Sequence, residues 1–232
     1  MCNLKLKSDV IIDNYTTYIC DKFDLEQNNV VFSEIPMFNP SELDQFQWNI
    51  GLICGNSGSG KSTIMKHLGN IQEPKYDYNK SIVSQFNNLS EEEVVELLTS
   101  VGLSSIPIWL HKPNELSTGE KARLDICWYI NQSKQSKSII LIDEFTSVVN
   151  RDCAKSLSFA LQRYIRKYNM KIILSSCHFD IIEWLKPDWI FNLNKKYEDK
   201  HEIEHLIYAD DNEYQTYNLT NEKNILTDKY QC

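Results

Sequence analysis

A glycine-rich stretch, residues 55–63, constrains the fold of this chain more than any other feature. It reads Gly-Asn-Ser-Gly-Ser-Gly-Lys-Ser-Thr and matches the pattern G-x-x-x-x-G-K-[ST] at every fixed position. An apolar run, residues 50–54, precedes it, and a helix-like run, residues 62–68, follows it. A strand, a glycine loop and a helix in this order aim backbone N–H groups at phosphate oxygens, at the positive end of the helix. The sequence therefore predicts that this chain binds a nucleoside triphosphate.

Each position of this loop has a predicted role. Lys61 is expected to neutralise the β- and γ-phosphates, and the Ser62 hydroxyl to hold Mg²⁺. The glycines let the backbone curl, because they adopt conformations that other residues avoid. The predicted nucleotide-binding residues of the loop are Gly55, Asn56, Ser57, Gly58, Ser59, Gly60, Lys61, Ser62 and Thr63.

A second group of functional residues follows the continuous apolar run 138–142, which is typical of a buried parallel strand. Asp143 and Glu144 come directly after it, at the carboxyl end where open α/β sheets bind ligands. Asp143 is expected to hold Mg²⁺ through its water shell, and Glu144 to polarise the attacking water. A strand that simply ends in solvated acids is the alternative, and the loop at residues 55–63 favours the catalytic interpretation.

The hydrophobic pattern predicts an α/β fold, in which strands alternate with helices around a mostly parallel, covered sheet. Residues 1–50 read as strands that lead to the loop. Further strands are predicted at residues 80–86, 138–142, 171–176 and 189–193, and helices at residues 90–102, 118–131, 152–168 and 181–185. Ser90 and Glu93 form a predicted capping box at the start of residues 90–102.

Composition narrows the classes of protein to which this chain can belong. Its 232 residues, 42% hydrophobic and 24% charged, are enough for one well-cored α/β domain, and its net charge is −8. An acidic chain has no overall attraction for nucleic acid or anionic lipid. The helix at residues 152–168 leaves a local nucleic-acid contact open, although a solvated face is the favoured interpretation. Its basic residues are Lys155, Arg163, Arg166 and Lys167.

The cysteines and the apolar runs indicate where the protein works. Seven cysteines are scattered without a C-x-x-C pair, as expected for free thiols in a reducing compartment. The N-terminus lacks the apolar core of a secretory signal, and no stretch approaches the ~20 apolar residues that a membrane span requires. We therefore expect a cytoplasmic protein that does not insert into a membrane.

The stretch Leu-Ser-Thr-Gly-Glu-Lys-Ala-Arg, residues 116–123, resembles the signature motif of the ATP-binding-cassette (ABC) ATPases, with Thr118 in place of a glycine. Taken alone, the stretch would be read as a serine-capped helix. In the ABC family the serine and the second glycine, here Ser117 and Gly119, contact the γ-phosphate of ATP held by a partner subunit. A serine hydroxyl at a helix N-terminus suits that anion.

Two further positions complete the resemblance. Gln85 resembles the glutamine that joins the Mg²⁺ shell and senses the γ-phosphate, and His178 resembles the switch histidine. Either residue would be unremarkable by itself. The five elements occur in the order of the family over residues 55–178, and the chain is therefore identified as a member of the ABC ATPases.

The resemblance implies a P-loop NTPase fold of the ABC type. Such a domain has a mostly parallel central sheet, N-terminal antiparallel strands and a helical subdomain, which is reduced in this chain. We expect one domain over residues 1–232, with a nucleotide-binding core of residues 1–84 and 138–195. Residues 86–131 would form the helical subdomain, and residues 196–232 a C-terminal extension.

The same resemblance implies an ATPase that uses ATP and Mg²⁺ and closes as a head-to-tail homodimer. The catalytic residues would be Lys61, Glu144 and His178, and the residues that hold Mg²⁺ would be Ser62, Gln85 and Asp143.

Two positions match the family less closely. Phe32 lies at a suitable distance before the loop to stack on adenine, with Phe38 as the alternative. Asn150 stands where the D-loop of the family ends in Asp, which puts details of communication between subunits in doubt.

The partner of the closing dimer is constrained only by a weaker resemblance. Residues 116–123 and 176–189 are similar to stand-alone ABC ATPases of phages and prokaryotes that are associated with acetyltransferase domains. This favours a soluble ATPase that acts on a separate, acetyltransferase-like chain. The alternative is an ATP-binding subunit that works with a membrane permease, although the interval between Gln85 and Ser117 is short for one. A binding module with little turnover is a third class.

Overall fold

The computed structural model describes residues 2–27, 30–194, 206–210 and 213–214. The chain divides into two compact units, Met1–Glu42 and Leu43–Cys232, each of which is described by itself below. The predicted single domain, with its core of residues 1–84 and 138–195, its helical subdomain of residues 86–131 and its extension of residues 196–232, stays a prediction.

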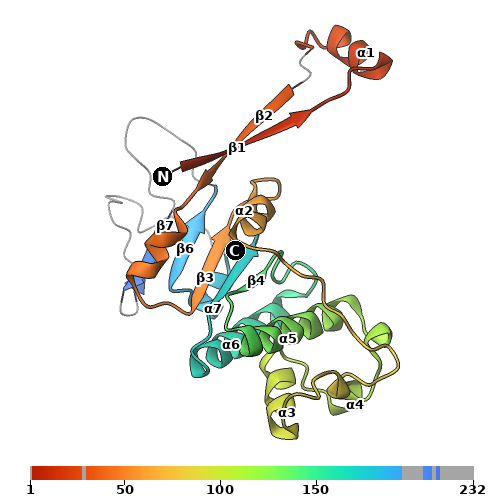
Figure 1. The fold of residues 1–232 in the computed structure, drawn as a ribbon, viewed down its shortest axis with the longest axis vertical. Helices are drawn as coiled ribbons and strands as arrows, with labels where there is room; N and C mark the ends of the chain where they lie inside the picture. The colour runs from red at the N-terminus through yellow and green to blue at the C-terminus, as the bar shows by residue number, and fades with distance from the viewer. Residues whose placement is uncertain (1, 28–29, 195–205, 211–212, 215–232) are drawn as a thin grey trace. The chain divides into compact units, whose positions relative to one another are not determined.

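The N-terminal unit, Met1–Glu42, is an antiparallel pair of strands with a helix between them (Figure 1). β1 (Cys2–Asp9) pairs with β2 (Val30–Met37), which confirms the predicted antiparallel N-terminal strands. Between them lies α1 (Asn14–Lys22), so the prediction of strands throughout residues 1–50 is wrong here. The helix begins where it does because Asp13 Oδ1 accepts hydrogen bonds from the N–H groups of Tyr15 and Thr16, at 3.0 and 2.9 Å.

The main unit, Leu43–Cys232, is built on one sheet with the strand order β4-β5-β3-β6-β7-β8 (Figure 1). The parallel strands are β4 (Ile140–Ile142), β5 (Ile172–Ser176), β3 (Ile50–Cys54) and β6 (Trp189–Asn192). Antiparallel strands β7 (Leu206–Asp210) and β8 (Glu213–Tyr214) extend one edge. Every residue of β3 and β5 is buried, as expected for parallel strands that are covered on both faces.

Helices of the main unit supply most of the remaining core. They are α2 (Lys61–Leu68), α3 (Glu91–Ser100), α4 (Ile106–Trp109), α5 (Thr118–Ser136), α6 (Arg151–Lys167) and α7 (Ile181–Leu185). The chain also forms short 3-10 helices, η1 (Pro40–Gln45), η2 (Val83–Gln85) and η3 (Pro113–Glu115). The predicted helices are therefore confirmed, and α5 continues beyond the predicted end at residue 131.

The predicted strand at residues 80–86 is wrong, because this segment forms the 3-10 helix η2 instead. Ile82 and Phe86 are buried, at 0% and 1% exposed, so apolar residues four apart enter the core from a tight turn. The Gln85 side chain closes the turn by bonding back to the backbone of residues 77–81. Apolar spacing alone could not distinguish these two conformations in so short a segment.

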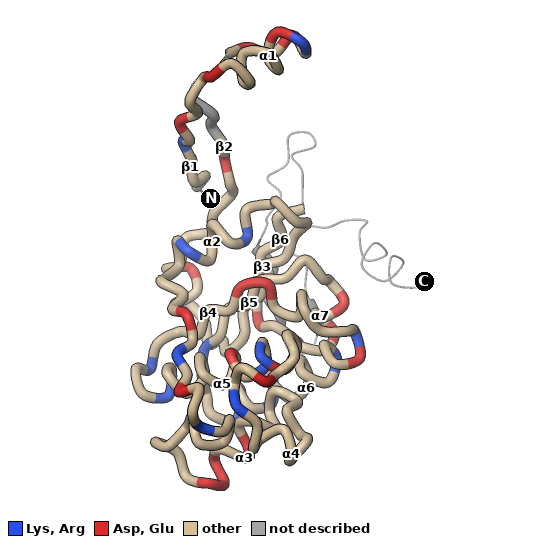
Figure 2. Tube along the Cα trace, turned by 90° about the vertical axis from the view of Figure 1, so that its right-hand side faces the viewer, with Lys and Arg blue, Asp and Glu red and all other residues tan. Residues whose placement is uncertain are grey.

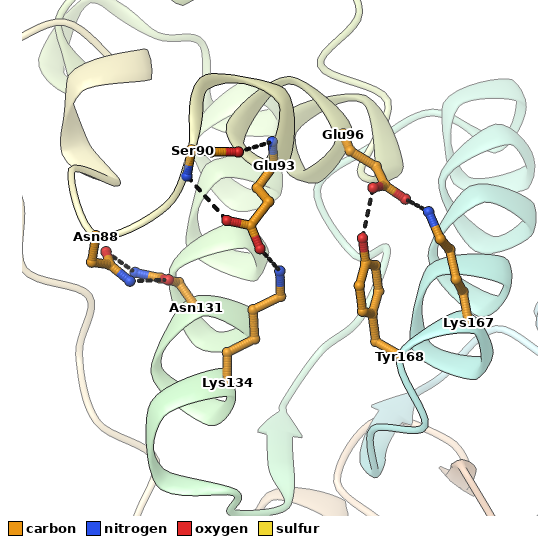
Figure 3. Close-up of polar contacts among 8 residues, drawn as sticks. All are labelled: Asn88, Ser90, Glu93, Glu96, Asn131, Lys134, Lys167 and Tyr168. Carbon is orange, nitrogen blue, oxygen red and sulfur yellow. Dashed lines mark hydrogen bonds and ion pairs between the residues drawn. The ribbon is translucent and has the colours of Figure 1, made fainter.

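Polar contacts fix α3 to α5 and α6 (Figure 3). The predicted capping box is confirmed, with Ser90 N–H donating to Glu93 at 3.0 Å and Glu93 N–H to Ser90 at 3.3 Å. The Asn88 and Asn131 side chains exchange hydrogen bonds of 2.9 and 3.1 Å. Glu96 accepts hydrogen bonds from Lys167 and Tyr168 at 2.6 and 2.7 Å, which lower the pKa of its carboxyl. These contacts tie α3 to α5 and to the C-terminal end of α6.

Two of the four basic residues predicted on this helix, Arg166 and Lys167, are paired with acids. Arg166 donates to Asp188 at 2.8 Å, and Lys167 pairs with Glu96 on α3. Lys155 lies over the ring of Trp184. Figure 2 shows Lys and Arg interspersed with Asp and Glu along the helices of the main unit. This pairing supports the favoured interpretation of a solvated helix face over a nucleic-acid contact.

The state of the cysteines and the lengths of the helices can be compared with the expectation of a cytoplasmic protein that does not insert into a membrane. The cysteines whose side chains are described are free thiols, and burial raises the pKa of the Cys54 thiol to about 12. Within the described part of the chain, no helix is both long and apolar enough to cross a bilayer.

Candidate functional site

The phosphate loop, residues 55–63, joins β3 to α2 and has the backbone that its glycines permit. Gly58 and Gly60 adopt φ angles of +78° and +99°, in the region that L side chains rarely occupy. Gly60 precedes the first turn of α2 and no side chain caps it, so the helix N-terminus faces the loop. The Lys61 side chain is 8% exposed, and its Nζ donates hydrogen bonds of 2.7 Å to the carbonyls of Gly55 and Asn56. The loop thus encloses the ammonium group that was predicted to meet phosphates.

The base of the phosphate loop is held by a residue that the sequence analysis missed. Asn194, which follows β6, accepts a hydrogen bond from the Asn56 N–H at 2.6 Å and donates one to its side-chain oxygen at 3.0 Å. A Cβ added at Gly55 would approach Leu193 Cβ to 2.9 Å, so the glycine is required by close packing. Asn194 is far from the loop in sequence, and nothing in its local pattern points to this contact.

A second turn, which we call the acid turn, comprises residues 143–146 after β4. Asp143 Oδ1 accepts hydrogen bonds from the Glu144 N–H, at 3.0 Å, and from the Ser175 hydroxyl. Glu144 and Thr146 have φ angles of +53° and +67°, which are uncommon for residues other than glycine. The Glu144 side chain is exposed, and Asp143 is half-buried. The two carboxylates therefore stand on a turn with an unusual backbone.

The sheet topology brings the predicted catalytic elements together at the carboxyl ends of three neighbouring strands. β5 lies between β3, which leads into the phosphate loop, and β4, which leads into the acid turn. All three strands are parallel, so their carboxyl ends meet on the same side of the sheet, where α/β proteins bind ligands. His178 follows β5, and its N–H donates to Ser176 Oγ at 3.1 Å. Ser176 Oγ in turn donates to the carbonyl of Phe145 in the acid turn, also at 3.1 Å.

For two predicted site residues, Gln85 and Phe32, the structure shows contacts other than the predicted ones. The Gln85 amide accepts from the Asp77 N–H and donates to nearby backbone carbonyls, at 2.9–3.2 Å, so it is engaged within its own turn. Phe32 belongs to the N-terminal unit, where its backbone pairs with Lys7. The alternative aromatic residue, Phe38, is 2% exposed. The roles of Gln85 and Phe32 stay predictions.

The signature stretch begins α5. Ser117 is its N-cap, is exposed, and donates from its N–H and its hydroxyl to Glu120, at 2.9 and 2.6 Å. These two hydrogen bonds lower the pKa of the Glu120 carboxyl. A Cβ added at Gly119 would lie 3.3 Å from Val149, so the start of α5 packs against residues 148–149. A cavity of ≈ 200 Å³ separates α5 from the acid turn, lined by residues that include Arg123, Asp125, Glu144 and Thr146.

The donor chemistry of the site suits Mg²⁺ and a triphosphate. Hydroxyl and carboxylate oxygens, here from Ser62 and Asp143, are the ligands that Mg²⁺ takes when phosphates supply the rest. Among the described residues, no group of three or more His, Cys, Asp or Glu side chains could hold a metal by itself. Mg²⁺ bound here would therefore depend on phosphate oxygens, as in other triphosphate sites.

A protein-family model and several known proteins resemble this chain. The family model described as Rad17 P-loop domain matches residues 35–186. The methionine import ATP-binding protein MetN 1 of Pseudomonas putida is 25% identical over 194 residues, which cover 64% of this chain and 56% of that protein. UvrABC system protein A of Aquifex aeolicus is 29% identical over 99 residues, 43% of this chain and 10% of that protein.

Solved structures resemble the chain more loosely. A dimeric bacterial ABC transporter cassette aligns with a TM-score of 0.47 and 14% identity, over 73% of this chain and 89% of the cassette. The predicted fold class is confirmed by the family model and by the architecture itself, an α/β P-loop NTPase with a mostly parallel sheet and an antiparallel N-terminal pair of strands. The chain spans about half the length of the MetN relatives that it matches.

Proposed function

This chain belongs to the Rad17 P-loop domain family of nucleotide-binding proteins, and on that premise we propose that it is an ABC-type ATPase that hydrolyses ATP with Mg²⁺. One observation carries the proposal. The phosphate loop, the acid turn and His178 follow three neighbouring parallel strands, so a phosphate-binding loop and a pair of carboxylates share one edge of the sheet.

The proposed mechanism consists mainly of positioning and electrostatics. Lys61 and the N–H groups of the phosphate loop bind the β- and γ-phosphates. Ser62 and Asp143 would hold Mg²⁺, which would offset the charge that develops on the phosphate oxygens. Glu144 orients the attacking water, and His178 stands at the end of the intervening strand to contact the γ-phosphate. The exposed carboxylate of Glu144 suits that role, because it is free to face solvent.

The proposed active form is a head-to-tail homodimer in the cytoplasm. Ser117 and Gly119 of one protomer would complete the ATP site of the other. The exposure of Ser117 supports this. Its hydroxyl, which donates to Glu120 in the protomer, would exchange that hydrogen bond for one to the incoming phosphate. Adenine would stack on Phe32, and Gln85 would leave its present turn to reach Mg²⁺.

Turnover and assembly of Glu144→Gln test the proposal. The wild-type chain is expected to release phosphate from ATP only when Mg²⁺ is present. Glu144→Gln is expected to bind ATP as the wild type does, to lose turnover by at least about 100-fold, and to elute as an ATP-bound dimer in size-exclusion chromatography. Glu183→Gln, which changes an exposed acid on α7, is the matched control. Normal turnover in Glu144→Gln would refute the assignment.

What the dimer acts on is proposed from resemblance. Residues 116–123 and 176–189 support a separate, acetyltransferase-like enzyme as the partner. The MetN relatives support the second candidate, an ATP-binding subunit that works with a membrane permease. Purification of the native protein from gently solubilised cells separates the two, because a stoichiometric multi-span membrane protein would favour transport. A wild-type chain that binds ATP without turnover would instead be a binding module.

A further inference from the structure

Ser175 contacts both acids of the proposed site, although no sequence pattern singles it out. It lies on β5, the strand between the phosphate-loop strand β3 and the acid-turn strand β4. Its side chain is 0% exposed. A buried hydroxyl must find hydrogen-bond partners, because leaving it unpaired costs free energy. Both partners of the Ser175 hydroxyl lie in the acid turn.

Three consecutive residues of the acid turn bond to Ser175. Its hydroxyl donates to Asp143 Oδ1 and accepts from the Glu144 N–H at 3.1 Å. Its backbone carbonyl accepts from the Phe145 N–H at 2.8 Å. A serine hydroxyl can donate one hydrogen bond, and Ser175 donates it to the Asp143 carboxylate. Ser175 therefore sets the orientation of the Asp143 side chain and the position of the backbone on either side of Glu144.

These bonds hold a backbone that would not be favoured by itself. Glu144 and Thr146 both have positive φ angles, of +53° and +67°. Such conformations persist where the surrounding structure over-determines them, and they gather at functional sites. The Ser175 bonds meet the turn at and beside Glu144, so they supply that constraint at the residue predicted to orient water.

The two oxygens of the Asp143 carboxylate also differ in the hydrogen bonds that they accept. Oδ1 accepts from both the Ser175 hydroxyl and the Glu144 N–H. Within the described part of the chain, Oδ2 accepts no hydrogen bond. One carboxylate oxygen is thus used for orientation, and the other is left for the water shell of Mg²⁺.

We propose that Ser175 is a positioning residue for ATP hydrolysis, which presents Asp143 to Mg²⁺ and fixes the backbone that carries Glu144. This inference rests on the proposed function. Ser175 touches neither substrate nor metal and acts through the two acids. Its loss should therefore affect the chemical step and the use of Mg²⁺, and should spare the phosphate loop on β3.

Steady-state kinetics of Ser175→Ala in the full chain test the inference. We expect kcat to fall by about 10- to 100-fold, as for loss of a hydrogen bond to a charged group. The Mg²⁺ concentration for half-maximal activity should rise severalfold, whereas KM for ATP and nucleotide binding without Mg²⁺ should stay within twofold. Ser175→Thr keeps the hydroxyl and should restore most of kcat.

Ser158→Ala is the matched control for burial. Ser158 is also 0% exposed, but it lies on α6 and its hydroxyl has no hydrogen-bond partner among the residues that the structure describes. Its removal should therefore leave kcat and the Mg²⁺ dependence unchanged. If Ser175→Ala does not fold, Ser175→Cys takes its place, since a thiol fills the space of the hydroxyl and is only a weak donor.

The outcomes separate this inference from the proposed function. A wild-type chain without ATP turnover refutes the proposed function and the inference with it. A wild-type chain with turnover, together with a Ser175 variant whose kcat and Mg²⁺ dependence lie within twofold of it, refutes the inference alone. Equal losses in the Ser175 and Ser158 variants would show an effect of packing and would also overturn the inference.

Discussion

The phosphate loop and the acid turn both follow parallel strands of one sheet, and both contain residues with positive φ angles. In the phosphate loop these residues are glycines, Gly58 and Gly60, which adopt that conformation without steric cost. In the acid turn they are Glu144 and Thr146, which do not, and the turn is held from outside by Ser175. The glycines of the phosphate loop allow its backbone conformation, whereas contacts with the neighbouring strand β5 maintain that of the acid turn.

This difference shows how the two halves of the site can fail. A change in the phosphate loop should act locally, through the backbone and Lys61, and should remove nucleotide binding. A change around the acid turn should leave binding intact and remove turnover. The predictions below test that division, from the largest expected effect to the smallest.

Lys61→Ala should produce the largest loss. The ammonium group is the main positive charge of the phosphate loop, and charge-assisted hydrogen bonds to phosphate are the strong ones. We expect ATP affinity, measured by isothermal titration calorimetry, to fall by at least about 100-fold. Lys66→Ala, which changes an exposed lysine on the same helix, should bind ATP normally. Retained affinity in Lys61→Ala would contradict the phosphate site.

Gly58→Ala isolates the backbone requirement of the phosphate loop. A Cβ at this position meets nothing within 4 Å, so the substitution adds strain without a clash. The left-handed conformation costs about 1–2 kcal/mol for a residue with a Cβ, and the free energy of unfolding should fall by that amount. ATP affinity should fall by about tenfold. Displaced N–H groups would bind phosphate less well, and a loss of about 1.4 kcal/mol in binding free energy corresponds to a tenfold loss of affinity.

Gly102→Ala is the control for that experiment. Gly102 has a φ angle of +74°, close to the +78° of Gly58, and an added Cβ would make only an ordinary contact of 3.7 Å with Arg123. Chemical denaturation should give similar stability losses for both variants, whereas only Gly58→Ala should weaken ATP binding. Equal ATP affinities in the two would show that the loop tolerates the change.

Thr146→Val asks whether every side chain of the acid turn contributes to its shape. Thr146 is 6% exposed and, in the described part of the chain, its hydroxyl has no hydrogen-bond partner, in contrast to that of Ser175. Because valine keeps the shape and removes a buried unpaired hydroxyl, we expect the free energy of unfolding to rise by up to about 1 kcal/mol. Turnover should stay within twofold. A large loss of turnover would mean that Thr146 also positions the acids.

The capping box at the start of α5 should give a small, pH-dependent effect. Hydrogen bonds from Ser117 lower the pKa of Glu120 in the folded protein. The box therefore contributes stability above the unfolded pKa of about 4.3, and this contribution is lost as the pH falls through the lowered folded pKa. The Tm difference between wild type and Glu120→Gln should shrink as the pH falls below about 4.3. A difference that does not change with pH would contradict this assignment.

Local patterns were sufficient for several elements because each depends on neighbours in the sequence. The predicted capping box at Ser90 and the serine cap at Ser117 each lie within one helical turn, and both are present as hydrogen bonds. The apolar run before Asp143 predicted a buried strand, and β4 forms there. The strand predicted at residues 80–86 failed, since burial of Ile82 and Phe86 is equally compatible with a turn that Gln85 closes.

The sequence by itself determined that a phosphate loop exists, since its glycines and lysine specify the backbone and charge within nine residues. It also determined which two acids follow the buried strand. The tertiary structure alone decided how those acids and the base of the phosphate loop are held, because Ser175 on β5 and Asn194 after β6 reach partners that are distant in the sequence. Such contacts depend on the order β4-β5-β3-β6, which is a property of the folded sheet and which local spacing does not encode.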